Sequence, residues 1–282
     1  MDDHDKGLAH DLDTLGRRRV LLGAAGLAAT TLLTAWGCGG GGAESSSTSS
    51  SSSGSSGSTG STGSTSTGTC AVSAEETQGP YPADGSNTIN GTVSNALALT
   101  GIVRSDIRPS FGTMTGTAAG VVTTLKLTVV NTNSSCADLS GYAVYVWHCD
   151  RDGEYSLYNA TTQNYLRGVQ ETDASGVATF TSVFPGCYSG RMPHIHIEVY
   201  RSATTATSYT NKLKTTQLAF PTDVCSTVYS TASGYSASVS NFANISFATD
   251  GVFSDGTSTE MSTVTGNAAD GYVVSLQLGI SV

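Results

Sequence analysis

Alternating hydrophobic and polar positions predict β-strands in the second half of the chain. In residues 121–130, Leu125, Leu127 and Val129 alternate with Lys126 and its polar neighbours, and a polar cluster follows. Successive residues of a strand point to opposite faces, so this pattern is typical of a strand with one buried face. We therefore expect a half-buried strand here.

Further short apolar runs follow, separated by turn signals. They occupy residues 142–147, 177–183, 194–200, 213–220 and 274–280. Gly, Pro and Asp punctuate the stretches between them, as at 150–153 and 185–186, and only 225–229 has a helical pattern. Many short strands joined by turns predict an all-β fold, a β-sandwich of mostly antiparallel strands with long loops and little helix.

The start of the chain has the pattern of a targeting signal rather than of a folded element. Arg17, Arg18 and Arg19 precede an apolar stretch rich in Ala and Leu that ends at Trp36. A twin-arginine export signal has this organisation, and the stretch is too short and too early for a stable membrane span. Residues 1–37 are therefore predicted to direct export, which places the mature protein outside the cytoplasm, secreted or tethered to the membrane.

Residues 38–69 predict a flexible tether between this signal and one folded domain, residues 70–282. The tether is almost entirely Gly, Ser and Thr, and Glu44 is its only charged residue. A segment of this composition cannot bury a core. Cys38 is a candidate lipid attachment residue of a lipoprotein, although the residues before it fit a cleavage box poorly, so its lipidation stays open.

The charge balance bounds the kinds of partner. The chain has 13 Lys and Arg against 22 Asp and Glu, a formal net charge of −9 at pH 7. Its basic residues form no cluster after the signal, whereas proteins that bind nucleic acids carry basic patches. We therefore expect no nucleic-acid partner.

Export also makes disulfides the default expectation for the cysteines that follow the tether. Their number is odd, so one is expected to be free or intermolecular. A Cys149–Cys187 bridge is the first expectation, because both residues lie a few positions from candidate site residues, and Cys136–Cys225 is the second. Sequence alone does not determine which cysteines pair.

A pair of histidines points to a metal site. Besides His148, the predicted domain contains His194 and His196, which are spaced i, i+2 and begin a run of strand formers. Both imidazoles should therefore leave one face of a strand. No acidic residue stands at a spacing that completes a two-histidine, one-carboxylate site, and Cys187 is expected to be oxidised. Neither an Fe(II) oxygenase nor a zinc enzyme is favoured.

Tyrosines are the unused oxygen donors near this pair. Tyr188 stands six residues before His194, and Tyr155 follows the turn that ends the preceding apolar strand. Phenolates are hard anionic donors, so two of them with two imidazoles would favour Fe(III). The alternative is that both tyrosines only pack in the core or at turns.

These residues together resemble a known family. The order Trp147-x5-Gly153-x-Tyr155, then Pro185-Gly186-x-Tyr188-x2-Arg191-x-Pro193-His194-x-His196, is similar to the iron signature of the intradiol ring-cleavage dioxygenases. This family is the protocatechuate 3,4-dioxygenase and catechol 1,2-dioxygenase group. The 78–81 element Gln-Gly-Pro-Tyr and the strand that contains Gln217 also resemble family segments, so the match spans about 75–220.

The resemblance implies a site and a reaction. Tyr155, Tyr188, His194 and His196 would bind non-haem Fe(III), with Tyr188 and His194 as the axial pair. A catechol would displace the Tyr188 phenolate and chelate the iron as a dianion. O2 would then attack the ring, and cleavage between the two hydroxylated carbons would give a cis,cis-muconate-type diacid.

The resemblance also assigns roles to two further residues. Arg191 would stabilise negative charge as the substrate ketonises, and Gln217 would assist O–O cleavage. The alternatives are that Arg191 is a solvated charge and Gln217 an ordinary strand residue. Long active-site loops leave open which catechol is the substrate.

Two departures from the family bear on these expectations. The tether stands where the catechol 1,2-dioxygenases have a helical dimerisation segment, so the oligomeric state is open. Residues 225–282 match no motif. A competing hypothesis is a non-catalytic extracellular β-sandwich module that binds sugars or aromatics.

Overall fold

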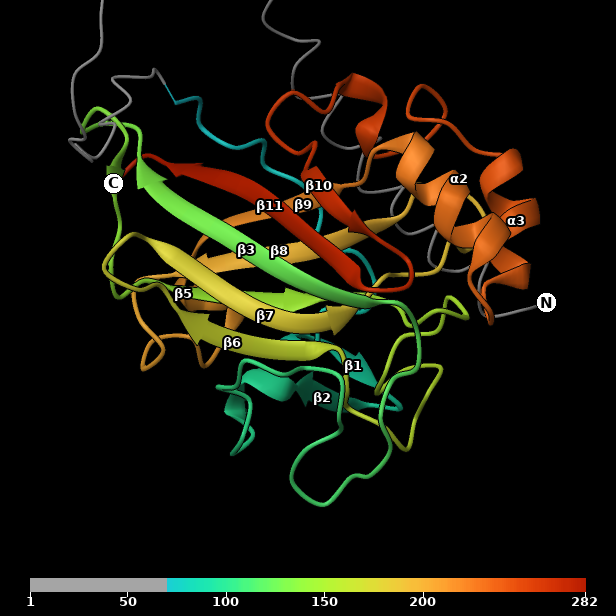
Figure 1. Cartoon of the computed structure of the whole chain (residues 1–282). Helices are drawn as coiled ribbons and strands as arrows, with labels where there is room; N and C mark the ends of the chain where they lie inside the picture. The colour runs from blue at the N-terminus through green and yellow to red at the C-terminus, as the bar shows by residue number, and fades with distance from the viewer. Residues whose placement is uncertain (1–69) are drawn as a thin grey trace, which may run out of the picture.

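Two β-sheets stacked face to face organise the fold (Figure 1). The computed structural model describes residues 70–282; the predicted export signal, the tether and Cys38 lie outside the described residues. The first sheet contains β10 (Thr263–Asn267), β11 (Gly271–Ile280), β3 (Val122–Asn131), β4 (Ala137–Asp138) and β7 (Val177–Val183). The second sheet has the order β6 (Arg167–Glu171), β5 (Ala143–Trp147), β8 (His194–Tyr200) and β9 (Lys212–Ala219).

The pairing is mostly antiparallel, as the sequence predicts. Among the named strands of residues 70–282, β11 and β3 form the one parallel pair. A small hairpin, β1 (Asp84–Ile89) with β2 (Thr92–Asn95), lies below the second sheet in Figure 1. The prediction of an all-β sandwich with little helix is confirmed.

The core lies between the two sheets. Leu125, Leu127 and Val129 of β3 are fully buried there and belong to one cluster with Val144 of β5 and Ile197 of β8. In β3 these residues alternate with more exposed ones, but every residue of β5 and β8 is buried. The second sheet is therefore covered on both faces, and its outer face is not a solvent surface.

Two helices lie side by side at one end of the sandwich (Figure 1). α2 (Thr222–Thr231) contains the predicted 225–229 helix and buries Cys225, Val228 and Tyr229. α3 (Ser236–Ala243) is not predicted by the pattern, because its run of Ser, Ala and Asn has no apolar stripe. Within residues 70–282, no helix is long and apolar enough to cross a membrane.

The β1–β2 hairpin and β10 are also absent from the sequence prediction. The hairpin turns at Asn90 and Gly91, which have positive φ values of 50° and 79° and thus suit a tight hairpin turn. Its strands carry mostly polar, partly exposed side chains, so the alternating apolar signal is missing. The turn residues are visible in the sequence, but without flanking apolar runs they predict only a loop.

The disulfide prediction is wrong. Cys70 and Cys136 form the bond, with a Cα–Cα distance of 5.7 Å, and Cys149, Cys187 and Cys225 are buried free thiols. The segment after Cys70 runs beside β11, where the Ser73 N–H donates to the Gly279 carbonyl. Because β11 pairs with β3, this path brings Cys70 to the turn that follows β3. The thiol of Cys149 instead faces the Gly186 carbonyl, at 3.5 Å.

Removing this disulfide should lower the free energy of unfolding. A Cys70→Ser/Cys136→Ser variant is expected to lose about 3–4 kcal/mol, because the bond closes a long loop between residues 66 apart in sequence. Urea unfolding followed by circular dichroism measures the difference. Reduction should destabilise the wild type to the same extent and leave the variant unchanged; equal midpoints for the oxidised proteins would contradict the assignment.

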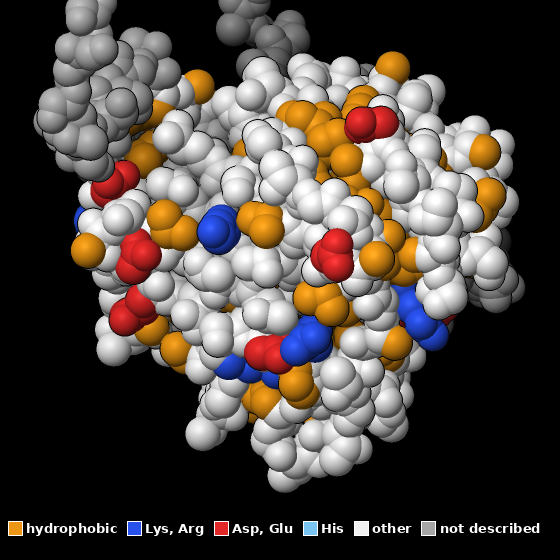
Figure 2. Space-filling model, in the orientation of Figure 1, with side chains coloured by type: hydrophobic (Ala, Val, Ile, Leu, Met, Phe, Trp, Pro, Cys, Tyr) orange, Lys and Arg blue, Asp and Glu red, His pale blue; other side chains and the backbone are white. Residues whose placement is uncertain are grey.

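The face of the molecule in Figure 2 has mixed charge. Lys and Arg side chains stand singly or beside Asp and Glu, and they form no continuous basic patch on this face.

Candidate metal centre

The candidate site lies on the outer face of the second sheet, at the start of β8. His194 and His196 alternate with buried Ile195 and Ile197, so their imidazoles share the face opposite the sandwich core. In the register of the sheet, His196 stands between Trp147 of β5 and Gln217 of β9. The sheet therefore determines where both histidines point.

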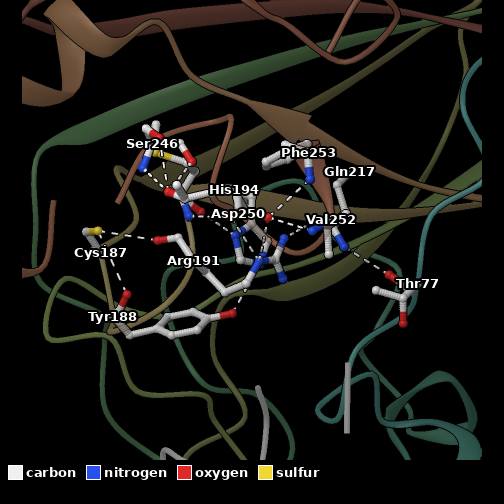
Figure 3. A network of polar contacts seen from close by, with 12 residues as sticks. Thr77, Cys187, Tyr188, Arg191, His194, Gln217, Ser246, Asp250, Val252 and Phe253 are labelled. Carbon is white, nitrogen blue, oxygen red and sulfur yellow. Dashed lines mark hydrogen bonds and ion pairs between the residues drawn. The ribbon is translucent and has the colours of Figure 1, made fainter. Parts of the chain in front are cut away.

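Four donor atoms from three segments meet at this point. His194 Nε2 lies 3.1 Å from His196 Nε2, 3.3 Å from Tyr188 Oη and 3.4 Å from Tyr155 Oη. Tyr155, His194 and His196 are buried, and Tyr188 is partly exposed. The structure thus brings together all four residues that the sequence proposes as ligands, and Figure 3 shows Tyr188 directed at His194.

The two tyrosines can approach because the turn before Tyr155 is tight. Asp150 Oδ1 accepts hydrogen bonds from the backbone N–H groups of Asp152 and Glu154. Gly153 has φ +90°, and a Cβ there would lie 3.1 Å from Tyr188 Cβ. A residue with a side chain would be strained at this φ and would press on Tyr188.

The tautomer of His194 leaves a lone pair for a ligand. Its Nδ1 lies 2.7 Å from the Met192 carbonyl, which can only accept, so Nδ1 carries the proton and Nε2 does not. Burial, and next the charge of Arg191, lower the pKa of both His194 and His196 well below the usual value. Both rings are therefore neutral, the form that binds metals.

The cluster suits a multivalent cation. Burial raises the pKa of Tyr155 well above its usual value, and the neighbouring Tyr188 adds to this, so without a cation the phenol keeps its proton. Donor atoms about 2.1 Å from a shared ion and about 90–110° apart lie roughly 3.0–3.4 Å from each other. The separations of 3.1–3.4 Å between His194 Nε2 and the other three donor atoms fit this arrangement. Phenol oxygens and imidazole nitrogens together fit a hard, highly charged ion such as Fe(III).

Other ligand sets do not form in residues 70–282. No three His, Cys, Asp or Glu side chains of this region gather closely enough to hold a metal ion. His148 is engaged elsewhere, with Nδ1 2.7 Å from the Cys149 carbonyl and Nε2 2.7 Å from Ser182 Oγ. Besides His196, the donors that meet His194 Nε2 are the phenol oxygens of Tyr155 and Tyr188.

Two of the four proposed ligands, His196 and Tyr155, pack against neighbouring aromatic rings. Trp147 stacks on His196 with ring centroids 4.9 Å apart and planes 3° from parallel. The Tyr81 ring lies 4.9 Å from the Tyr155 ring. Tyr81 belongs to an N-terminal strap, residues 75–82, which pairs with β9 through a hydrogen bond from the Glu76 N–H to the Thr215 carbonyl.

Arg191 and Gln217 lie together beside the cluster (Figure 3). Arg191 Nη2 donates to Gln217 Oε1 at 2.7 Å, and Gln217 Nε2 donates to the Thr77 carbonyl at 3.0 Å. Both side chains are buried. The alternative of a solvated charge at Arg191 is therefore wrong.

Two residues of the site escape sequence reasoning. Asp250 accepts from Arg191 Nε at 3.1 Å, and the Phe253 ring lies 5.7 Å from the guanidinium of Arg191 and 6.3 Å from the His194 ring. Both come from a C-terminal segment, residues 236–262, that covers this side of the second sheet. Asp250 precedes Gly251 among polar residues, which in sequence predicts only a surface turn. No signal in the sequence distinguishes it.

Comparison with known proteins supports the same fold. No protein-family model matches the sequence, and no curated protein matches it. The structure is similar to an intradiol ring-cleavage dioxygenase from Tetranychus urticae, at 25% identity, over 75% of this chain and 95% of that chain, with a TM-score of 0.56.

Two weaker likenesses were found. One is the dioxygenase domain of a carbohydrate-binding fusion from Streptomyces sp. SirexAA-E, at 23% identity, over 65% of this chain and 96% of that chain, with a TM-score of 0.41. The other is 3-chlorocatechol 1,2-dioxygenase from Rhodococcus opacus 1CP, at 20% identity, over 74% and 72%, with a TM-score of 0.45. The resemblance to intradiol ring-cleavage dioxygenases that the motifs predict is thus found again in the structure, through the T. urticae enzyme.

Proposed function

We propose that this chain is a non-haem Fe(III) intradiol dioxygenase. It would cleave catechol-type rings with O2 between the two hydroxylated carbons and release cis,cis-muconate-type diacids. The observation that carries the proposal is that Tyr155 Oη, Tyr188 Oη and His196 Nε2 all lie 3.1–3.4 Å from His194 Nε2. Its fold, similar to that of a solved intradiol dioxygenase, adds support.

Ferric iron, when bound by these four residues, would draw electron density from a chelated catechol and so direct O2 to the ring carbon.

The four proposed ligands differ in how firmly they are held. Trp147 packs on His196, and Tyr81 packs on Tyr155, whereas Tyr188 is the partly exposed member. Tyr188 is therefore the side chain best placed to move, and its Oη would accept a proton from a substrate hydroxyl.

Arg191 and Gln217 would act on the substrate after binding. The Arg191 guanidinium is fixed by Asp250 on one edge and by Gln217 on another. A charge held in this way stabilises negative charge on a ketonising substrate without further reorganisation. Gln217 links Arg191 to the strap through Thr77 and would assist the later bond cleavage.

Colour and iron content test the proposal. The pure protein should contain about one iron per chain and show a broad visible band from tyrosinate-to-Fe(III) charge transfer. It should consume O2 with catechols and form a product with muconate-like ultraviolet absorption. A colourless, iron-free protein that does not consume O2 after incubation with iron would overturn the proposal and favour the binding-module hypothesis.

Gln217 can be tested without disturbing the proposed ligands. A Gln217→Met variant keeps the side-chain volume but loses the hydrogen bonds to Arg191 and Thr77, so kcat is expected to fall about 10–100-fold with the visible band unchanged. Thr216→Val is a matched control, because the Thr216 hydroxyl is buried without a hydrogen-bond partner. Steady-state O2 uptake gives kcat for both variants. If Gln217→Met and Thr216→Val had the same kcat, Gln217 would have no role in catalysis beyond that of an ordinary strand residue.

The location of this activity is part of the proposal. The twin-arginine pattern of residues 1–37 supports export, and Cys38 would carry a lipid if it is the mature N-terminus. The intact mass of the mature protein separates the cases. A chain beginning elsewhere than Cys38 would exclude lipidation there.

A further inference from the structure

Asp250 is a fully enclosed acidic residue beside the candidate site. Its side chain is fully buried, yet both carboxylate oxygens have partners. Oδ1 accepts from Arg191 Nε at 3.2 Å and from the N–H groups of Val252 and Phe253 at 2.8 and 3.1 Å. Oδ2 accepts from Arg191 Nε at 3.1 Å and from the Met192 N–H at 2.6 Å. Each of these partners is a donor, and an ionised carboxylate only accepts.

The contacts of Asp250 with Arg191 extend to Gln217, the other residue proposed to act on the substrate. Asp250 binds Arg191 at Nε, so the Nη2 edge of the guanidinium is left to meet Gln217 at 2.7 Å. Gln217 in turn donates to Thr77 of the strap. A single chain of hydrogen bonds thus joins the C-terminal segment, the turn before β8, strand β9 and the strap (Figure 3).

The contact of Asp250 with Met192 extends to a proposed ligand. Asp250 accepts from the Met192 N–H, and the Met192 carbonyl accepts from His194 Nδ1 at 2.7 Å. Partners of this second kind determine the tautomer and the ring orientation of a ligating histidine. The carboxylate therefore steadies Arg191 directly and His194 through one residue.

We propose that Asp250 is a positioning residue of the ring-cleavage site, which sets the orientation of Arg191 and of the His194 ring together. The inference rests on the proposed function. It gives the C-terminal segment, for which the sequence offers no motif, a defined part in assembling the site.

The carboxylate, rather than any polar group of its size, is what the position requires. An amide at 250 would present its NH2 either to the Val252 and Phe253 N–H groups or to the Met192 N–H. In both orientations donors face donors. Asp250→Asn should therefore shift Arg191 or His194 while changing the side-chain volume little.

The test compares full-length, iron-loaded Asp250→Asn with the wild type and with Asp255→Asn. Asp255 lies five residues later in the same segment and is exposed, so it controls for a generic loss of charge. Asp250→Asn is expected to bind iron, to show a shifted visible band, and to lose about 100-fold in kcat, the cost of a small misplacement of catalytic groups. KM should change less than about threefold, and Asp255→Asn should match the wild type.

The outcomes separate this proposal from the proposed function. A wild type without iron or ring cleavage overturns the proposed function. An active wild type with an equally active Asp250→Asn, or with an unshifted band in that variant, overturns the positioning role alone. Should Asp250→Asn fail to fold, Asp250→Glu decides: reduced kcat with a shifted band supports the role, and wild-type behaviour refutes it.

Discussion

The His196→Ala variant is expected to purify without iron and without the visible band, with ring cleavage reduced about 1,000-fold or more. Loss of a residue that only orients a ligand typically costs about 10–100-fold in metal affinity, and loss of the ligand itself should cost more. His196 Nε2 lies 3.1 Å from His194 Nε2, so its removal opens one side of the cluster. Iron analysis, the visible spectrum and O2 uptake together measure the effect.

His148→Ala is the matched control for this result. His148 is as buried as His196, but its ring nitrogens face the Cys149 carbonyl and Ser182 Oγ. This variant should lose stability yet retain iron and colour. If His196→Ala kept its full iron content and band, the proposed ligand set would be wrong, whatever its activity.

The Arg191→Met variant is expected to lose both stability and activity. It leaves the buried Asp250 carboxylate with backbone N–H donors but without its ion-pair partner, which typically costs about 3–5 kcal/mol. Removal of a fixed charge at the site should also lower kcat about 10²–10³-fold. Urea unfolding at pH 7 and O2 uptake measure the two effects separately.

An exposed ion pair on the surface offers a control for the predicted loss of stability in Arg191→Met. Arg108 and Asp106 also form an ion pair, at 2.8 Å, but their side chains are 33% and 41% exposed. Arg108→Met should therefore cost less than about 1 kcal/mol. An Arg191→Met variant as stable as Arg108→Met would show that the Arg191–Asp250 pair contributes little to folding.

Sequence patterns predict the strands whose two faces differ or whose residues are all apolar. β3 is predicted from its alternation and β5 from its continuous apolar run, each within a residue or two. The β1–β2 hairpin is not predicted, because its mostly polar strands lack the alternating apolar pattern. The Cys70–Cys136 bond is a property of strand order, which short-range sequence does not reveal.

In the candidate site, too, local sequence patterns place some residues and not others. His194 and His196 can be placed on one face because they are two positions apart in one strand, which is a full repeat of side-chain direction. Tyr155 lies 39 positions before His194, with β6 and β7 between them, so the family resemblance assigns it to the site more firmly than its spacing does. Asp250 is 59 residues from Arg191, and nothing local in either stretch predicts that they meet.

The parallel pairing of β3 with β11 bears on the order in which the chain can fold. β3 pairs with β7 on one side, but on the other side Thr123 pairs with Tyr272, so that edge of β3 is completed by a strand from the far end of the domain. Such long-range contacts slow folding, because the loop must close before the contacts compensate for its entropy. β10 pairs only with β11 among the named strands of residues 70–282, so this hairpin also forms from the last residues of the domain. Synthesis of the whole domain should therefore precede a stable sandwich, and the nascent chain would stay sensitive to proteases until its last strand is in place.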